Sequence, residues 1–175
     1  IIQQTLLLGV VLLAATRREA HGRLELAPVE LAGAFSALCL IGLATLLYFT
    51  GFAFWVHDYP RGGNFTGLLV AAVLFVATVI GLALFVGSFF RVREHATLFI
   101  LMTSLPLFFL ANLSWPVEAT PRALTWLAKL VPSTPGINAM VKLNEMGASL
   151  VEAAPELANL ALLAAGYAAL AWWRI

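Results

Sequence analysis

Charged residues are scarce in this sequence. Lys and Arg number 10 and Asp and Glu 9 among 175 residues, or 11% in all. Soluble globular domains carry about 25% charged residues, so this chain has too little charge to cover a surface that faces water. The two signs nearly cancel at a net charge of +1, which leaves no basic patch for nucleic acid. The composition therefore argues against a soluble domain and against a nucleic-acid partner.

Cysteine and catalytic motifs are also lacking. The one thiol, Cys39, lies in an apolar stretch, so neither a disulfide framework nor a metal cluster is expected. The sequence contains no nucleotide-binding loop G-x-x-x-x-G-K-[ST], no zinc-protease motif H-E-x-x-H and no hydrolase motif G-x-S-x-G. We therefore expect no catalytic residue, no metal and no cofactor in this chain.

Long uncharged runs are what the sequence has instead. A helix needs about 20 apolar residues to cross a bilayer. The runs lack the period-two alternation of membrane β-strands, so we interpret them as helices. The prediction is an all-α, polytopic membrane helical bundle with five spans, at residues 1–16, 31–56, 65–90, 96–113 and 157–173. The first run opens the sequence with Ile1, and we expect it to be the end of a longer span.

The loops between these runs differ in positive charge. Alternate assignment places six cations in one set of loops and four, spread over a longer stretch, in the other. The first set is Arg17, Arg18, Arg23, Arg91, Arg93 and Arg174, and the second is Arg61, Arg122, Lys129 and Lys142. Loops rich in Lys and Arg stay in the cytoplasm. The sequence therefore predicts a multi-pass protein of the inner (plasma) membrane with a cytoplasmic C-terminus.

The stretch between the fourth and fifth runs is interrupted by prolines and is amphipathic. Residues 121–131 and 137–146 would each form a helix with polar residues on one face and apolar residues on the other. Both segments are too short to cross a bilayer. We predict a re-entrant helix pair on the outer side of the bundle. A solvated surface hairpin is the alternative. Gly147, just after the second helix, suits a helix C-cap.

The same stretch resembles the C-terminal signature of type-2 permeases of ABC exporters. The resemblance rests on the order of the residues LPLFFLANLSWPVEATPRALTWLAKLVPSTPGINAMVKLNEMGA. The residues that fall on the pattern are Pro106, Asn112, Pro116, Glu118, Pro121, Pro132, Pro135, Asn144 and Gly147. The HDYPRGG turn resembles the multidrug-type branch of that family. On this resemblance, residues 1–175 form the C-terminal part of an ABC type-2 transmembrane domain.

The resemblance implies a function and a set of partners. The chain would be a permease subunit that forms the translocation pathway of an exporter, and a separate ABC ATPase subunit would bind ATP and magnesium. Further partners would be a second permease in a homo- or heterodimer, the lipid bilayer and a periplasmic adaptor protein. The resemblance places ATPase coupling in two cytoplasmic loops, at Arg17, Arg18, Glu19, His21 and Arg23, and at Arg91, Arg93, Glu94 and His95. These cations also serve as orientation signals, and both interpretations stay open.

Two other classes of function remain as alternatives. An intramembrane enzyme would need a nucleophile and a base together within the bilayer, and Ser104 has no histidine or lysine at its depth. A non-transporting scaffold or assembly protein is the second alternative. No Asp, Glu, Lys or Arg lies inside a predicted span, which argues against a proton-coupled carrier.

Overall fold

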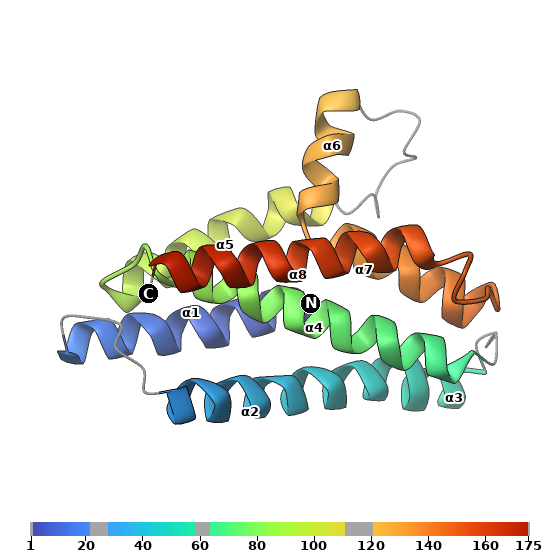
Figure 1. The fold of residues 1–175 in the computed structure, drawn as a ribbon, viewed down its shortest axis with the longest axis horizontal. Coiled ribbons are helices and arrows are strands. Elements are labelled where there is room, and N and C mark those ends of the chain that lie inside the picture. The colour runs from blue at the N-terminus through green and yellow to red at the C-terminus, as the bar shows by residue number, and fades with distance from the viewer. Residues whose placement is uncertain (1, 22–27, 59–63, 111–120, 175) are drawn as a thin grey trace.

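The structure, a computed structural model, describes residues 2–21, 28–58, 64–110 and 121–174 (Figure 1). Its helices are α1 (Ile2–His21), α2 (Pro28–Leu47), η1 (Tyr48–Ala53), α3 (Phe54–Val56), α4 (Phe65–Gly87), α5 (Arg93–Leu110), α6 (Arg122–Leu130), α7 (Ser133–Met140), η3 (Val141–Glu145) and α8 (Ala154–Arg174). The segments η1 and η3 are π-helical. No strand occurs in these four ranges, so the all-α class is confirmed for them.

Three helices are long and apolar enough to cross a membrane. They cover Phe35–Val56, Phe65–Gly87 and Ala154–Arg174, and a shorter apolar helix covers Ile2–Thr16. The helix α5 opens with the polar sequence Arg93–His95, and its described part ends at Leu110. Residues 111–113 of the predicted fourth span lie outside the described residues. Five spans therefore stay a prediction, whereas three are supported by length and composition.

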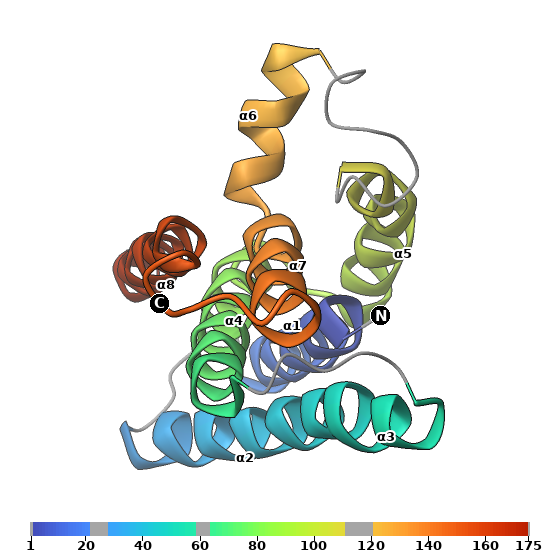
Figure 2. The same cartoon turned by 90° about the vertical axis from the view of Figure 1, so that its right-hand side faces the viewer.

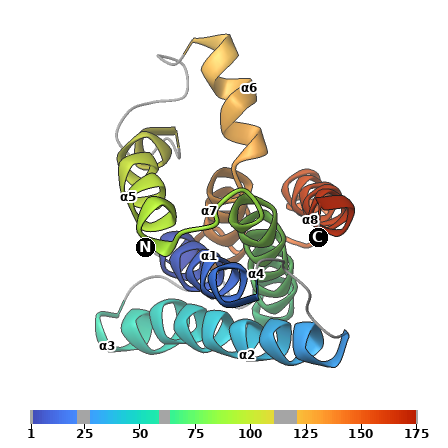
Figure 3. The ribbon, with the colours of Figure 1, turned by 90° about the vertical axis from the view of Figure 1, so that its left-hand side faces the viewer.

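The helices pack in layers around α4 (Figures 2 and 3). The oblique rod α2–η1–α3 forms one side, α1 and α4 lie in the middle, and α5, α7 and α8 lie on the opposite side. The helix α4 contacts α1, α2, α7 and α8. Twelve of its residues are buried, which is why its sequence is apolar all round. α4 is thus the central helix of the bundle.

The core between α1 and α4 is built from small and β-branched side chains. Val10, Val11, Val76 and Val79 have no exposed surface. A Cβ added at Gly87 would lie 2.9 Å from the Cβ of Ala14, so the two helices approach closely there. In a bilayer such contacts are stabilised by van der Waals packing, because lipid tails are as apolar as the side chains.

Helix ends alternate between two ends of the bundle (Figure 1). The ends of α1, α4 and α8 lie at one end together with the starts of α2 and α5. The end of α3, the start of α4 and the start of α8 lie at the other. The long helices α2, α4 and α8 therefore run along the length of the bundle.

The short helix α7 begins at Ser133, not at residue 137 as expected, and α8 begins at Ala154 instead of 157. Pro135 and Pro155, two of the prolines that interrupt this stretch of the sequence, lie in the first turns of these helices. Amide groups in a first turn have no partner within the helix, so proline loses nothing there. The earlier start gives α8 a length of 21 residues.

Candidate functional site

The predicted coupling segment at the end of α1 continues the helix. Arg17, Arg18, Glu19 and His21 follow the apolar part Ile2–Thr16 within α1, which ends at His21. Arg23 lies outside the described residues. The charged segment is therefore a helical extension of α1 up to His21.

The second predicted coupling segment surrounds the start of α5. The side chains of Arg91, Arg93, Glu94 and His95 are exposed. Arg93 Nε lies 3.3 Å from Glu94 Oε1. The pKa of Glu94 is lowered by a hydrogen bond from its own backbone amide and by the Arg93 side chain, so the carboxyl stays ionised. An exposed pair of this kind contributes little to stability and leaves the charges accessible to a partner.

The end of α8 joins the same surface. The guanidinium of Arg174 lies over the ring of Phe89, 4.7 Å from the ring centre. A cation over an aromatic face is attracted by the ring electrons. This contact places the last residues of α8 beside the turn between α4 and α5, so cations from separate parts of the chain gather at one end.

The predicted outer signature is only partly described. Pro106 lies inside α5, Pro121 caps α6, and Pro132 caps α7. Asn112, Pro116 and Glu118 lie outside the described residues. The signature prolines therefore mark helix starts at α6 and α7 and an interior position in α5.

The helix α6 projects sideways from the bundle (Figures 1 and 2), so the two short helices do not cover the bundle end together. Its C-terminal end is held by α8, because Tyr167 Oη donates to the carbonyl of Leu130 at 2.7 Å and Asn159 Nδ2 to that of Lys129 at 3.2 Å. The last carbonyls of a helix lack partners within it, so these bonds satisfy them. The apolar side chains of Leu124 and Leu127 are exposed.

The helix α7, in contrast, is packed into the bundle. Gly136 lies against the ring of Phe75 of α4, where an added Cβ would overlap the ring. After η3 the backbone turns at Gly147, whose φ of 64° is a left-handed conformation that glycine adopts readily. The C-cap of η3 is Met146, and Gly147, predicted as the cap, is the residue that follows it. Lys142 Nζ of η3 lies 2.8 Å from Glu156 Oε1 of α8, which ties the segment to α8.

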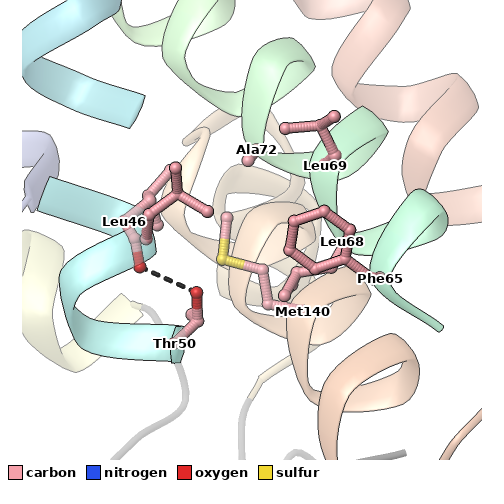
Figure 4. A pocket seen from close by; sticks show the side chains of 8 residues that line it. Leu46, Thr50, Phe65, Leu68, Leu69, Ala72 and Met140 are labelled. Atoms are coloured by element: carbon pink, nitrogen blue, oxygen red, sulfur yellow. Dashed lines mark hydrogen bonds between the residues drawn. The ribbon is translucent and has the colours of Figure 1, made fainter. Parts of the chain in front are cut away.

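A crevice opens between η1 and the start of α4, which the sequence analysis did not predict. Its wider part has a volume of about 210 Å³ and is lined by Leu47, Thr50, Gly51, Asn64, Phe65, Leu68 and Asn144. Its inner part is almost filled, and Figure 4 shows Met140 reaching between Leu46 and the side chains of α4. Asn64 before an apolar run is an N-cap signal that could have marked the edge of this crevice.

Together these features are those of a membrane helical bundle, with long apolar helices, one charged end and a short helix packed among the long ones. Residues 31–173 match the family model for ABC-2 family transporter protein. The match covers most of the chain, which therefore belongs to the ABC-2 transporter family. The comparisons with curated proteins and with solved structures give no match. The match begins after α1, so it includes the Arg91–His95 segment and excludes Arg17–His21.

Proposed function

We propose that this chain is part of the permease of an ATP-driven exporter in the inner (plasma) membrane. Two permeases form the translocation pathway, as a homo- or heterodimer, and a separate ABC ATPase subunit binds ATP and magnesium. Membership of the ABC-2 family supports the permease role. The charged end of the bundle faces the cytoplasm and receives the ATPase, and a periplasmic adaptor protein is a further partner at the opposite end.

The observation that carries this proposal is the gathering of cations at one end of the bundle. The end of α1, the α4–α5 turn and the end of α8 lie there together (Figure 1), with Arg91, Arg93 and Arg174. Lys129 and Lys142, which lie away from this end, interact with Trp126 and Glu156 within the chain. Arg91 and Arg93 are exposed, and exposed cations are suited to acidic groups on a partner.

The arrangement of α7 supports an outer end that closes the pathway. The helix runs beside α4 and α8, within the length of those helices (Figure 1). Buried side chains of α7 and η3 face the bundle, namely Thr134, Pro135, Ala139 and Leu143. A helix of 8 residues, continued by the 5 residues of η3, fits a re-entrant segment, since it enters the bundle without crossing it.

Replacement of the charged end of α1 tests the coupling. The variant Arg17→Ala/Arg18→Ala is expected to lower ATP hydrolysis by the purified permease–ATPase complex at least fivefold, because the ATPase loses its contact with α1. The matched control Lys129→Ala changes an exposed cation on α6, away from the charged end, and is expected to leave hydrolysis unchanged. Membrane insertion of both variants, measured by extraction and gel filtration, is expected to equal that of the parent.

Equal hydrolysis in the double variant and in the control would show that these arginines only orient the chain. Co-purification of an ABC ATPase with the full-length protein tests whether the permease binds an ATPase at all, without regard to the residues that form the contact. A permease that purifies with no ATPase, and that has an activity of its own, would contradict the proposed function.

A further inference from the structure

The end of α8 reaches past the end of α4 and carries an arginine there. Tyr167 of α8 lies against Gly81 of α4, so this face of α8 packs on α4. Arg174 follows Tyr167 on the same face, because residues i and i+7 of a helix align. The helix α4 ends at Gly87, and the guanidinium of Arg174 lies over the ring of Phe89 in the turn beyond it, 4.7 Å from the ring centre. The packing of α8 on α4 therefore fixes the place of this cation.

The charge of Arg174 is not neutralised by an acidic group in the part of the chain that the structure describes. Within the same part, the guanidinium makes no hydrogen bond. Other cations are paired, since Arg93 lies beside Glu94 and Lys142 beside Glu156. The contact with Phe89 uses the charge of the guanidinium and no acceptor atom, so the N–H donors stay available. Arg174 is therefore ready to bind an anion from outside the bundle.

Two tryptophans next to Arg174 place this cation at the membrane surface. Trp172 and Trp173 are 82% and 81% exposed. They end a candidate membrane span, Ala154–Arg174, most of whose apolar surface is not buried within the bundle. Tryptophan at the end of such a helix lies at the level of the lipid headgroups. A guanidinium that follows these rings directly lies at the depth of the lipid phosphates.

We propose that the end of α8 and the α4–α5 turn bind the headgroup of an anionic phospholipid, with the Arg174 guanidinium hydrogen-bonded to its phosphate. Guanidinium and phosphate form paired, charge-assisted hydrogen bonds. The exposed Arg91 and Arg93 give this end an excess of positive charge over Glu94, which favours an anionic lipid over a zwitterionic one. Binding needs no ATPase, so the site is independent of the proposed coupling. Only its leaflet, the cytoplasmic one, rests on the proposed function.

Native mass spectrometry of the purified full-length protein, without ATPase or ATP, tests the assignment. Phosphatidylglycerol and phosphatidylcholine are titrated separately, and the parent is expected to bind phosphatidylglycerol more tightly. The variant Arg174→Ala is expected to raise the Kd for phosphatidylglycerol about fivefold, the usual effect of one basic residue near an anionic membrane. Its Kd for phosphatidylcholine is expected to equal that of the parent.

The matched control is Lys129→Ala, because Lys129 is also an exposed cation over an aromatic ring, 4.6 Å from the centre of Trp126. It lies on α6, and its replacement is expected to change the Kd for phosphatidylglycerol less than twofold. Gel filtration shows that each variant is folded before it is compared.

Two further variants separate the charge of Arg174 from its position. Arg174→Lys keeps the charge and is expected to bind phosphatidylglycerol within about twofold of the parent, since lysine also binds phosphate as a point charge. Phe89→Leu keeps an apolar side chain but removes the ring below the guanidinium. It is expected to raise the Kd two- to threefold, because the cation is no longer held in place.

Equal Kd values for phosphatidylglycerol in Arg174→Ala and Lys129→Ala would overturn the proposal. Equal losses in Arg174→Ala and Arg174→Lys would also overturn it, because the charge would then have no part in binding. Soluble glycerol phosphate is the second probe, and if it displaces the lipid, the site binds free anions and the lipid assignment is wrong. If Arg174→Ala keeps its affinity for phosphatidylglycerol but no longer co-purifies with an ATPase, this surface belongs to the ATPase contact instead.

Discussion

Single hydroxyl groups connect helices inside this bundle. Thr78 of α4 has no exposed surface. Its Oγ1 lies 2.6 Å from the carbonyl of Leu74 in the same helix and 3.1 Å from that of Leu160 in α8. Thr45 of α2 makes the first kind of bond alone, at 2.7 Å to Ile41. Comparison of variants at Thr78 and Thr45 therefore distinguishes the contribution of a hydrogen bond between helices from that of a hydrogen bond within one helix.

The variant Thr78→Val is expected to lower the free energy of unfolding by about 0.6 kcal/mol, the average measured for polar contacts between membrane helices. Valine has nearly the same shape, so packing is retained while the bond to Leu160 is lost. Thr45→Val is the control and is expected to change stability less. Unfolding of the purified protein in mixed micelles with increasing sodium dodecyl sulfate measures the free energy of unfolding of each variant. An equal decrease in the two variants would show that it comes from the lower helix propensity of valine and not from the lost bond to Leu160.

The loop before α8 contains a carboxylate that responds to pH. Glu152 accepts hydrogen bonds from the amide and the hydroxyl of Ser149, at 2.7 and 2.8 Å. The backbone bond is the larger cause of its lowered pKa, and the hydroxyl bond adds to it. A carboxyl whose pKa is lowered on folding stabilises the fold above its ordinary pKa of 4.5, and this effect is lost as the pH falls through the lowered value.

The variant Glu152→Gln is expected to have a lower melting temperature than the parent at pH 7. The difference is expected to shrink below pH 4.5 as the parent carboxyl takes up its proton. Thermal unfolding of the purified protein at a series of pH values measures the difference. A difference that does not change with pH would show that the charge of Glu152 has no part in it.

At the scale of elements, the position of α7 depends on its close approach to α4. Gly136 is buried against the ring of Phe75, and no larger residue fits without movement of that ring. Gly166 of α8, by contrast, has nothing within 4 Å of an added Cβ. Substitution of each glycine by alanine therefore distinguishes the effect of crowding against Phe75 from the general effect of alanine on helix stability.

The variant Gly136→Ala is expected to destabilise the protein by about 1–3 kcal/mol, as overpacked cores do. Gly166→Ala is expected to be neutral or stabilising, because alanine favours helix. The double variant Gly136→Ala/Phe75→Leu, with a smaller side chain opposite, is expected to recover part of the loss. Unfolding in sodium dodecyl sulfate measures all three, and the absence of recovery would place the crowding elsewhere.

The sequence predicts most of these elements from local patterns. Uncharged runs indicate the long helices because backbone groups in lipid must bond within their own segment. The start of α7 differs from the predicted residue 137 because Pro135 is accepted in the first turn of a helix, where its missing amide is not needed. The direction of α6 could not be predicted, since Tyr167 and Asn159, which hold its end, follow some thirty residues later.

The spacing of small residues in α8 does not predict which of them contact another helix. Ala161, Ala165 and Ala169 form a ladder in the sequence, but all three are exposed. Gly81 of α4, in contrast, lies against Tyr167 and Ala168 of α8. The spacing of small residues shows only that two helices could pack closely. The three-dimensional arrangement decides which of the small residues lie in a contact between helices.

At the scale of the whole molecule, the two ends of the bundle are expected to lie on opposite sides of the membrane. In a Cys39→Ala background, Met146→Cys, in the turn between η3 and α8, is expected to react in intact cells with a maleimide that does not cross membranes. Arg93→Cys and Arg174→Cys are expected to react only after the cells are opened. Met146, Arg93 and Arg174 are all exposed, so access to these side chains is not limited by burial. The opposite result would reverse the proposed orientation.

The sideways direction of α6 makes the protein wider at one depth than at others. Nine residues of helix extend about 14 Å beyond the bundle, with Leu124 and Leu127 exposed. If this helix lies in a single leaflet, it displaces lipid there and none in the facing leaflet. The permease would then have the shape of a wedge, and the lateral pressure of the membrane would act on α8 through the hydroxyl of Tyr167.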